Sequence, residues 1–208
     1  MENTFTVENV AVRRGQLVLL TLSDGREIEM DRRTWEQSPF RANSALTEEN
    51  LSALLSLSAQ NRARERALFL LSRRDYTKKE LSEKLRKAAD RDTASEMAER
   101  MEELGLVDDE KLAERYAREY CFVRHYPKRR AVQKLREKGV DREIAAAAVE
   151  KIGADDLQAA LAFLDKKCYT QKEEPQRRKI TDALIRYGFD YETARAALRQ
   201  MEELEESF

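Results

Sequence analysis

A pattern that returns about every 50 residues constrains this 208-residue chain more than any other feature. Three segments carry the pattern, two clearly and the last more weakly: 130–141, 178–190 and 77–90. Equivalent leucines in the three copies, Leu85, Leu135 and Leu184, are spaced by 50 and 49 residues. A fixed period of this size is typical of repeat arrays, in which each unit buries its apolar face partly against its neighbours. Such arrays present long surfaces to partners, so the pattern favours a binding protein over an enzyme.

Composition and local signals predict that the repeats are helical. Charged residues make up 38% of the chain and hydrophobic residues 41%, while glycine (6) and proline (3) are scarce. Aspartates suited to helix starts and glycines suited to helix ends recur along the repeats. We therefore predict a mainly α chain of tandem three-helix bundles with a small N-terminal β part. The predicted parts are a β meander with a connector at 1–45, leading helices with a first three-helix repeat at 46–107, a second repeat at 108–153 and a third at 154–208.

The N-terminal segment differs from the rest because it contains short β-rich runs. The runs are 5–12, 16–22 and 26–30. Asp24-Gly25, between two of them, is a strong hairpin signal because both residues tolerate positive φ. A three-stranded meander is marginal alone, so we expect it to pack on the following helices through Trp35 or Phe40. Residues 39–45 are predicted to form a connector. We predict that a helix over 48–57, with Thr47 as its N-cap, and a separate helix over 61–73 follow it.

The net charge is only −1, but the charges are unevenly distributed along the chain. Residues 62–153 hold 24 basic and 19 acidic side chains, whereas residues 1–61 hold 6 and 9, and residues 154–208 hold 9 and 12. Within the basic middle, residues 124–138 include seven Lys or Arg and one acid, Glu137. Because local field rather than net charge attracts phosphate, this segment is compatible with nucleic-acid binding.

The basic segment and its counterparts in the other repeats supply the candidate binding residues. Lys128, Arg129 and Arg130 fall in the first turn of a predicted helix, where positive charge opposes the helix dipole and exposed amides would suit a phosphate or a carboxylate-rich surface. The alternative is a solvated helix face. If the repeats stack in order, the cations form one stripe, and the interleaved acids favour weak rather than tight DNA binding. The full predicted set is Arg73, Arg74, Lys78, Lys79, Lys84, Arg86, Arg124, Lys128, Arg129, Arg130, Lys134, Arg136, Lys138, Arg177, Arg178, Lys179 and Arg186.

Several of these features also have a purely structural explanation. Arg73 and Arg74 end a predicted helix, where they would complement its dipole. Aromatic residues beside the basic segment could stack on bases, but their helical spacing suits core packing better. These aromatic residues are Tyr116, Tyr120, Phe122 and Tyr126.

Catalytic and cofactor chemistry have little support in the sequence. The single histidine, His125, has no nearby carboxylate, and there is no serine elbow or glycine-rich phosphate loop. Cys121 and Cys168 belong to no CxxC or Cys/His cluster and are expected to be reduced core thiols. We predict no enzyme activity, no metal and no cofactor. Without a signal peptide or a long apolar run, we expect a cytoplasmic protein that does not contact membranes.

An ordered set of motifs resembles the RecX family, bacterial regulators of the RecA recombinase. The first resembling segment runs from Ala67 to Arg86 and includes Leu71-Ser72-Arg73-Arg74 and Lys79-Glu80-Leu81. The second runs from Leu104 to Ala113, and the third is Lys134-Leu135-Arg136-Glu137-Lys138-Gly139. With the N-terminal β segment, which is similar to the leader of some members, the resemblance covers essentially the whole chain. No single motif is specific for this family, but the ordered set of motifs is.

The resemblance implies a fold, a partner and an activity. It implies tandem three-helix repeats in an elongated, curved monomer that lodges in the groove of the RecA–DNA filament and limits filament growth and recombinase activity. This would place the protein in homologous recombination, DNA repair and the SOS response, with weak binding to single- and double-stranded DNA. Two alternatives stay open: an independent DNA-binding protein, since three-helix units resemble helix-turn-helix modules, and a helical adaptor for an unrelated partner.

Overall fold

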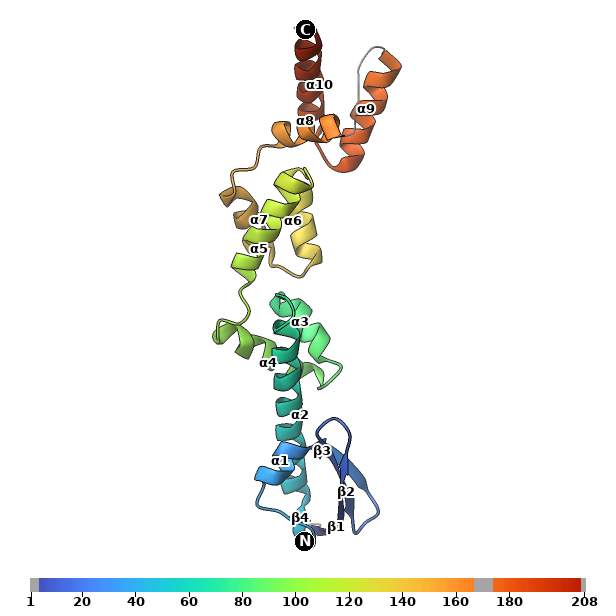
Figure 1. Ribbon diagram of the computed structural model, residues 1–208, viewed down its shortest axis with the longest axis vertical. Helices are drawn as coiled ribbons and strands as arrows, with labels where there is room; N and C mark the ends of the chain where they lie inside the picture. The colour runs from blue at the N-terminus through green and yellow to red at the C-terminus, as the bar shows by residue number, and fades with distance from the viewer. Residues whose placement is uncertain (1–3, 167–173, 207–208) are drawn as a thin grey trace. The chain divides into compact units, whose positions relative to one another are not determined.

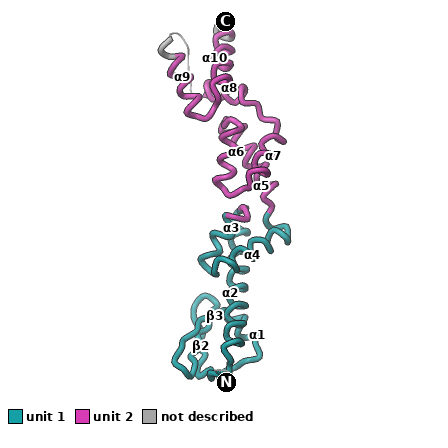
Figure 2. Tube along the Cα trace, turned by 180° about the vertical axis from the view of Figure 1, so that it is seen from behind, with its two compact units in different colours: residues 1–76, 80–107 teal, residues 77–79, 108–208 magenta. Residues whose placement is uncertain are grey.

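Helices dominate the computed structural model, which describes residues 4–166 and 174–206, with side chains over 4–166 and 177–203 (Figure 1). The prediction of a mainly α chain with a small N-terminal β part is confirmed. The chain divides into two compact units (Figure 2). The first comprises residues 1–76 and 80–107, and the second residues 77–79 and 108–208. The finer four-part division stays a prediction.

The first unit begins with an antiparallel sheet of strand order β3-β2-β1-β4. The strands are β1 (Thr4–Arg13), β2 (Leu17–Leu22), β3 (Glu27–Asp31) and β4 (Ala45–Thr47). The predicted three-stranded meander is therefore incomplete, because β4 occupies the end of the predicted connector. Phe5 pairs with Leu46, and the flanking threonines Thr4 and Thr47 pair with each other. A strand of three residues exists only through such distant pairing, which no local pattern signals.

A short helix, α1 (Arg32–Gln37), follows the sheet and was not predicted. Asp31 caps it, since one carboxylate oxygen accepts hydrogen bonds from the Thr34 amide (2.8 Å) and hydroxyl (2.9 Å). Six residues are too few to show a helical period, so no periodic pattern predicts this helix. Trp35 is buried among the sheet residues and Phe40 packs beside them, as expected.

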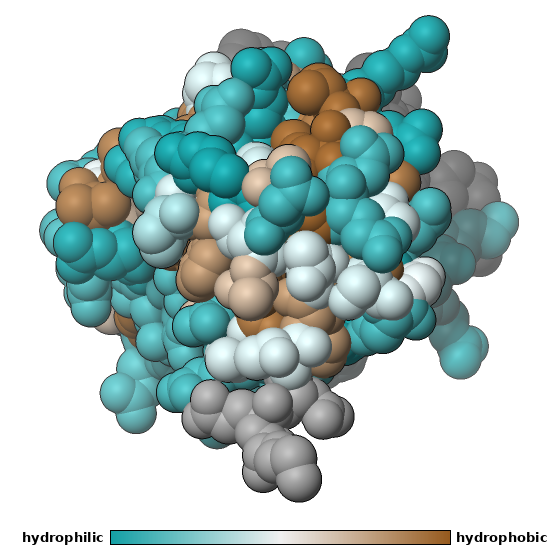
Figure 3. Space-filling view, turned by 90° about the horizontal axis from the view of Figure 1, so that it is seen from below, coloured by the Kyte–Doolittle hydropathy of each residue, from teal (hydrophilic) through white to brown (hydrophobic). Residues whose placement is uncertain are grey.

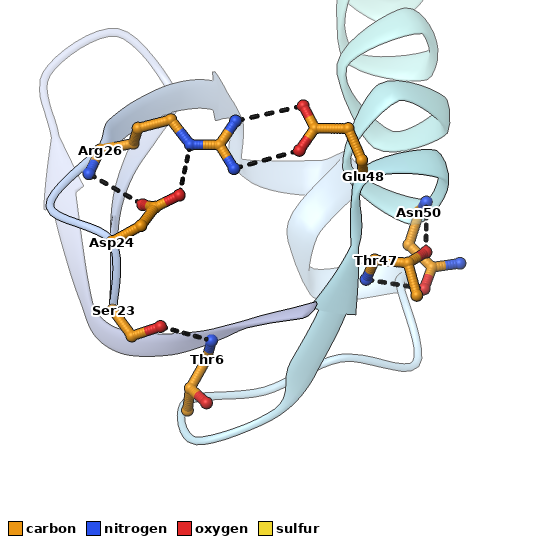
Figure 4. Close-up of polar contacts among 7 residues, drawn as sticks. All are labelled: Thr6, Ser23, Asp24, Arg26, Thr47, Glu48 and Asn50. Atoms are coloured by element: carbon orange, nitrogen blue, oxygen red, sulfur yellow. Dashed lines mark hydrogen bonds and ion pairs between the residues drawn. The ribbon is translucent and has the colours of Figure 1, made fainter. Parts of the chain in front are cut away.

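One continuous helix, α2 (Glu48–Leu71), replaces the two helices predicted over this stretch. Ser58 to Asn61 contains no glycine or proline to stop the first helix, so it continues. Thr47 is its N-cap, as predicted, with a reciprocal hydrogen bond to Asn50 (Figure 4).

Arg26 joins the β2–β3 hairpin to the start of α2 (Figure 4). Its guanidinium donates to Asp24 at 2.7 Å and, through two nitrogens, to Glu48 at 3.1 Å each. The same group lies 4.2 Å from the centroid of the Phe5 ring. Glu48 also occupies the first turn of α2, where negative charge suits the helix dipole. The β segment therefore packs on the helix through specific contacts.

The two halves of α2 bury different faces. The first half buries Leu51 and Leu54 in the sheet's core. The second half buries Ala67 and Leu70 in another core, shared with α3 (Lys78–Leu85) and α4 (Arg91–Glu103).

Seen from the N-terminal end (Figure 3), hydrophilic residues cover most of the surface and hydrophobic ones form separate patches.

The second unit holds two sets of helices, each around its own core. A π-helical turn over Glu119–Val123, which was not predicted, extends α5. The C-terminal helix continues to Glu206. The helices are α5 (Asp109–Arg118), α6 (Lys128–Glu137), α7 (Arg142–Lys151), α8 (Asp156–Lys166), α9 (Glu174–Tyr187) and α10 (Tyr191–Glu206).

A hydrogen bond that occurs twice in the second unit reflects the repeat. The Lys78 amide donates to the Asp109 carboxylate at 2.9 Å, and the Lys128 amide donates to the Asp156 carboxylate at 2.8 Å. Each aspartate lies in the first turn of a helix that opens the next repeat. It satisfies an amide at the start of a helix in the preceding repeat. Successive repeats therefore share an equivalent hydrogen bond as well as a similar sequence.

Candidate functional site

Arg130 ties α6 to the end of α9 and gives the candidate site its shape. Its guanidinium donates to the Tyr187 carbonyl at 2.5 Å and lies 4.3 Å from the ring centroids of both Tyr126 and Tyr187. Tyr187 is the last residue of α9, where a cation complements the helix dipole. Gly188 follows at φ +117°, a conformation that glycine adopts readily. Arg130 therefore has a structural role, although the sequence placed it with the binding residues.

An open groove of about 400 Å³ lies beside this joint. Helix α6 contributes Arg129 and Arg130 from its first turn and Lys134 from its last turn, and the end of α9 contributes Arg186. None of the described residues that line it is a carboxylate; the others are Gln133, Ile185, Tyr187, Gly188 and Phe189. We call it the α6–α9 groove. Four cations around one concave surface with no acid in its lining favour an anionic ligand.

The four cations of the α6–α9 groove are not equally available. Lys134 makes an ion pair with Glu137 at 2.5 Å, and Arg130 is held between the tyrosines. Arg186 donates its Nε to the Asp182 backbone carbonyl at 3.2 Å and, like Arg129, makes no ion pair with any described carboxylate. Both arginines are exposed. Arg129 and Arg186 are thus the cations whose charge is uncompensated.

At the start of α6, one positive charge is already ion-paired and one backbone amide is already hydrogen-bonded. The Lys128 ammonium pairs with Glu150 at 3.0 Å, and this hydrogen bond raises the pKa of Lys128. Its amide is the one bound by Asp156, so the expectation of freely exposed amides at this helix start is wrong for Lys128. The hydrogen bond from Lys134 lowers the pKa of Glu137, so this carboxylate is charged at neutral pH. Side chains, rather than the helix terminus, would therefore bind a ligand.

Most other predicted cations lie away from the α6–α9 groove. In the first unit, Arg73 stacks on Phe69 and Arg74 pairs with Glu80 at 3.2 Å. In the second, Arg124 pairs with Glu119 at 2.5 Å. One stripe through all repeats stays a prediction. The remaining members are Lys84 and Arg86 in the first unit, and Lys78, Lys79, Arg136, Lys138, Arg177, Arg178 and Lys179 in the second.

A second hollow, of about 630 Å³ between α9 and α10, includes two arginines that sequence reasoning missed. Arg195 and Arg199 line it together with Arg178 and with Arg177, which pairs with Glu202. Their spacing of four residues, one helical turn, was the signal that could have identified them. Because Asp182 and Glu202 also line this hollow, its charge is more balanced than that of the α6–α9 groove.

The aromatic cluster is mainly structural. Tyr116, Tyr120 and Tyr126 stack in sequence at centroid distances of 5.9 and 5.8 Å. Tyr120 is buried, and the other two pack against the same core, so core packing is confirmed for all three. Phe122 differs, because 50% of it is exposed.

Cys121 is a free, buried cysteine, and burial raises the pKa of its thiol to about 11. This agrees with the expected core thiol. Cys168 lies outside the described residues.

Metal-ligand clusters and membrane-spanning helices are both absent from the described residues. No group of three or more His, Cys, Asp or Glu in this part of the chain is arranged to hold a metal ion. No helix in the described ranges is both long and apolar enough to cross a membrane.

Comparison with known proteins identifies similar chains. The family described as "RecX, second three-helix domain" matches residues 108–149. A protein named Regulatory protein RecX from Clostridioides difficile (strain 630) is 25% identical over 166 residues, which are 78% of each chain. Its namesake from Xanthomonas axonopodis pv. citri (strain 306) is 32% identical over 138 residues, covering 65% of this chain and 85% of that one. That from Prosthecochloris aestuarii (strain DSM 271 / SK 413) is 31% identical over 152 residues, covering 71% and 98%.

Two crystal structures share the fold. One, of a regulatory protein RecX, has a TM-score of 0.65 at 18% identity and covers 94% of this chain and 99% of that one. The other, of RecX from Lactobacillus salivarius, has a TM-score of 0.61 at 23% identity and covers 70% and 98%.

Proposed function

The chain belongs to the RecX family, and we propose that it is a non-enzymatic regulator that binds the RecA–DNA filament and limits its assembly, ATP turnover and recombinase activity. The family relationship supports the regulatory role, since the similar proteins carry the name Regulatory protein RecX. The α6–α9 groove is the observation that supports an anionic partner surface. Phosphates of filament DNA or acidic side chains of RecA are the anions it would meet.

The proposed mechanism needs no chemistry within this chain. A series of helical repeats can contact more than one protomer of a filament at once, because each repeat presents its own surface. A regulator bound across protomers stabilises one arrangement of them relative to another, and so shifts the balance between filament growth and disassembly. ATP turnover by RecA would change as a consequence.

The direct test is RecA's ATP hydrolysis on single-stranded DNA, titrated with this protein well below one molecule per RecA. We expect a large decrease at such ratios. The test variant combines Arg129→Glu with Arg186→Gln and should require a higher concentration for the same effect. Arg129→Glu places an acid in the first turn of α6, where the dipole tolerates it, so folding should be preserved.

Arg142→Glu is the matched control, because Arg142 is also exposed and in the first turn of a helix, α7, and makes no ion pair with a described carboxylate. It does not line the α6–α9 groove. Equal potency of the double variant and this control would remove the groove from the proposal. No effect of the unmodified protein on RecA would refute the regulatory function itself.

An independent DNA-binding protein is the alternative, since the α6–α9 groove suits phosphates without any recombinase. Footprinting on duplex DNA in the absence of RecA separates the two functions. A defined sequence footprint would favour the alternative, whereas weak, salt-sensitive binding without a footprint agrees with the filament regulator. Each phosphate neutralised on the duplex should contribute about −0.9 to the slope of log affinity against log salt.

A further inference from the structure

One face of α2 in the first unit carries an exposed phenylalanine among arginines. Arg62, Arg66 and Phe69 fall within about 60° of one another around the helix, at 100° per residue, and Arg73 lies in the turn just after the helix ends at Leu71. The Arg66 and Arg73 guanidinium carbons lie 5.4 and 4.6 Å from the centroid of the Phe69 ring. Phe69 is 47% exposed. We call these four residues the Phe69 face.

The exposure of the Phe69 face follows from how α2 is packed. Leu51, Leu54 and Ser58 point to nearly the same side of the helix as Phe69, and in the first half of α2 the sheet covers this side. In the second half the buried side is the one that carries Ala67 and Leu70, so the side with Phe69 is left open. A large aromatic ring on the solvent side adds nothing to either core.

The arginines of the Phe69 face carry charge that no nearby described acid compensates. None of Arg62, Arg66 and Arg73 makes an ion pair with a carboxylate among the described residues. By contrast, Arg26, Arg74 and other cations of the same unit do. Uncompensated positive charge next to an exposed ring suits a ligand that is a polyanion and also carries flat rings.

A hollow of about 350 Å³ adjoins this face and could hold the next part of such a ligand. Arg62 and Arg66 line it from α2, and Gly15 and Gln16 line it from the β1–β2 turn. Of the two acids in its lining, Asp31 is already committed to capping α1, which leaves Glu65. The cations therefore continue from the ring into a concave surface.

We propose that the Phe69 face binds single-stranded nucleic acid, with one base stacked on Phe69 and the neighbouring phosphates held by the arginines. Bases stack on exposed aromatic side chains in single-strand binders, and arginine adds cation–π contacts and charge. An acidic protein segment would match the charge, but only a nucleic acid carries a flat ring beside every negative charge. The proposal deepens the proposed function by naming a DNA contact within it. Its test contains no RecA, so the two can fail separately.

A tryptophan at position 69 reports stacking directly. In the full-length Phe69→Trp variant, we expect saturable quenching of the added emission on titration with a thymidine oligonucleotide. The chain's own Trp35 is only 6% exposed and provides a constant baseline. Duplex DNA, whose bases are already stacked, should not quench, and neither should a polyglutamate peptide. Phe122→Trp is the matched control, since Phe122 is 50% exposed and makes no cation–π contact among the described residues.

The affinity of the oligonucleotide gives a second readout. Phe69→Leu keeps an apolar side chain but removes the ring, and should weaken binding at least about fivefold, the lower end for loss of one stacked base. Phe122→Leu should leave the affinity unchanged, and thermal melts should match for both variants because both positions are exposed. Binding without quenching at position 69, together with equal affinities of the two leucine variants, would overturn the proposal. So would full displacement of the oligonucleotide by polyglutamate of equal charge, or no binding by the unmodified protein.

Discussion

Arg130→Ala is expected to destabilise the second unit, although its neighbour Arg129 carries the same charge and occupies the same helical turn. A hydrogen bond from a charged group contributes about 1.5–3 kcal/mol, and each half-exposed cation–π contact about 0.5–1 kcal/mol. Arg130 makes one such hydrogen bond, to Tyr187, and two ring contacts. Because these share one side chain they are not additive, and we expect a total loss of about 2–4 kcal/mol.

The assay is thermal unfolding followed by circular dichroism. For a unit of roughly 100 residues, a loss of this size should lower Tm by at least about 8 °C. Trp35, the only tryptophan, lies in the first unit, so its fluorescence reports that unit and should be unaffected. Arg129→Ala should change stability by less than about 0.5 kcal/mol, as is usual for exposed positions.

Arg130→Lys separates charge from shape, because lysine keeps the charge but loses the planar group that stacks between two rings. We expect its Tm to lie between those of the unmodified protein and Arg130→Ala. If Arg130→Ala and Arg129→Ala had the same Tm, Arg130 would not be the clamp between α6 and α9. Its assignment to the binding residues alone would then be restored.

Three further predictions concern the backbone, an acid and a thiol. Gly139→Ala should destabilise the second unit clearly more than Gly153→Ala in urea unfolding: both have positive φ, but only at Gly139 would a Cβ lie 2.8 Å from a side-chain carbon. The amide of residue 143 lowers the pKa of Asp141, so the stabilisation by this helix cap is complete above the unfolded pKa of about 3.9 and is lost as pH falls through the lower folded value. Between pH 5 and 2, Asp141→Asn should therefore lose less stability than the unmodified protein, and an equal loss in both would refute this. Cys121, in a Cys168→Ser background, should react with a thiol reagent only on unfolding, and fast reaction in the folded protein would contradict its burial.

Much of the helical framework could be predicted because its signals are local. Asp108 and Asp141 cap helices, and Gly105 and Gly139 end them with positive φ, in agreement with the predicted use of aspartates at helix starts and glycines at helix ends. Each signal acts within a few residues, through a side chain that satisfies a nearby amide or a backbone that tolerates one conformation. The 50-residue period is likewise visible in the chain alone, because each repeat must bury the same leucine.

Whether a cation is ion-paired, uncompensated or structural could not be predicted from the sequence where its partner is distant along the chain. Glu150 pairs with Lys128 across 22 residues, and Tyr187 binds Arg130 across 57. Lys128, Arg129 and Arg130 are equivalent as residue types, yet packing makes the first an ion pair, the second an uncompensated charge and the third a clamp.

Local sequence signals establish most helices of the repeats, many of their ends, the repeat itself and the location of positive charge, since these depend on neighbouring residues. Contacts between distant segments instead determine that β4 joins the sheet, that α2 changes its buried face, and that Phe69 lies exposed among arginines. Each of these depends on which distant segment covers a given surface. That choice is made by packing and pairing over long separations, which no local pattern encodes.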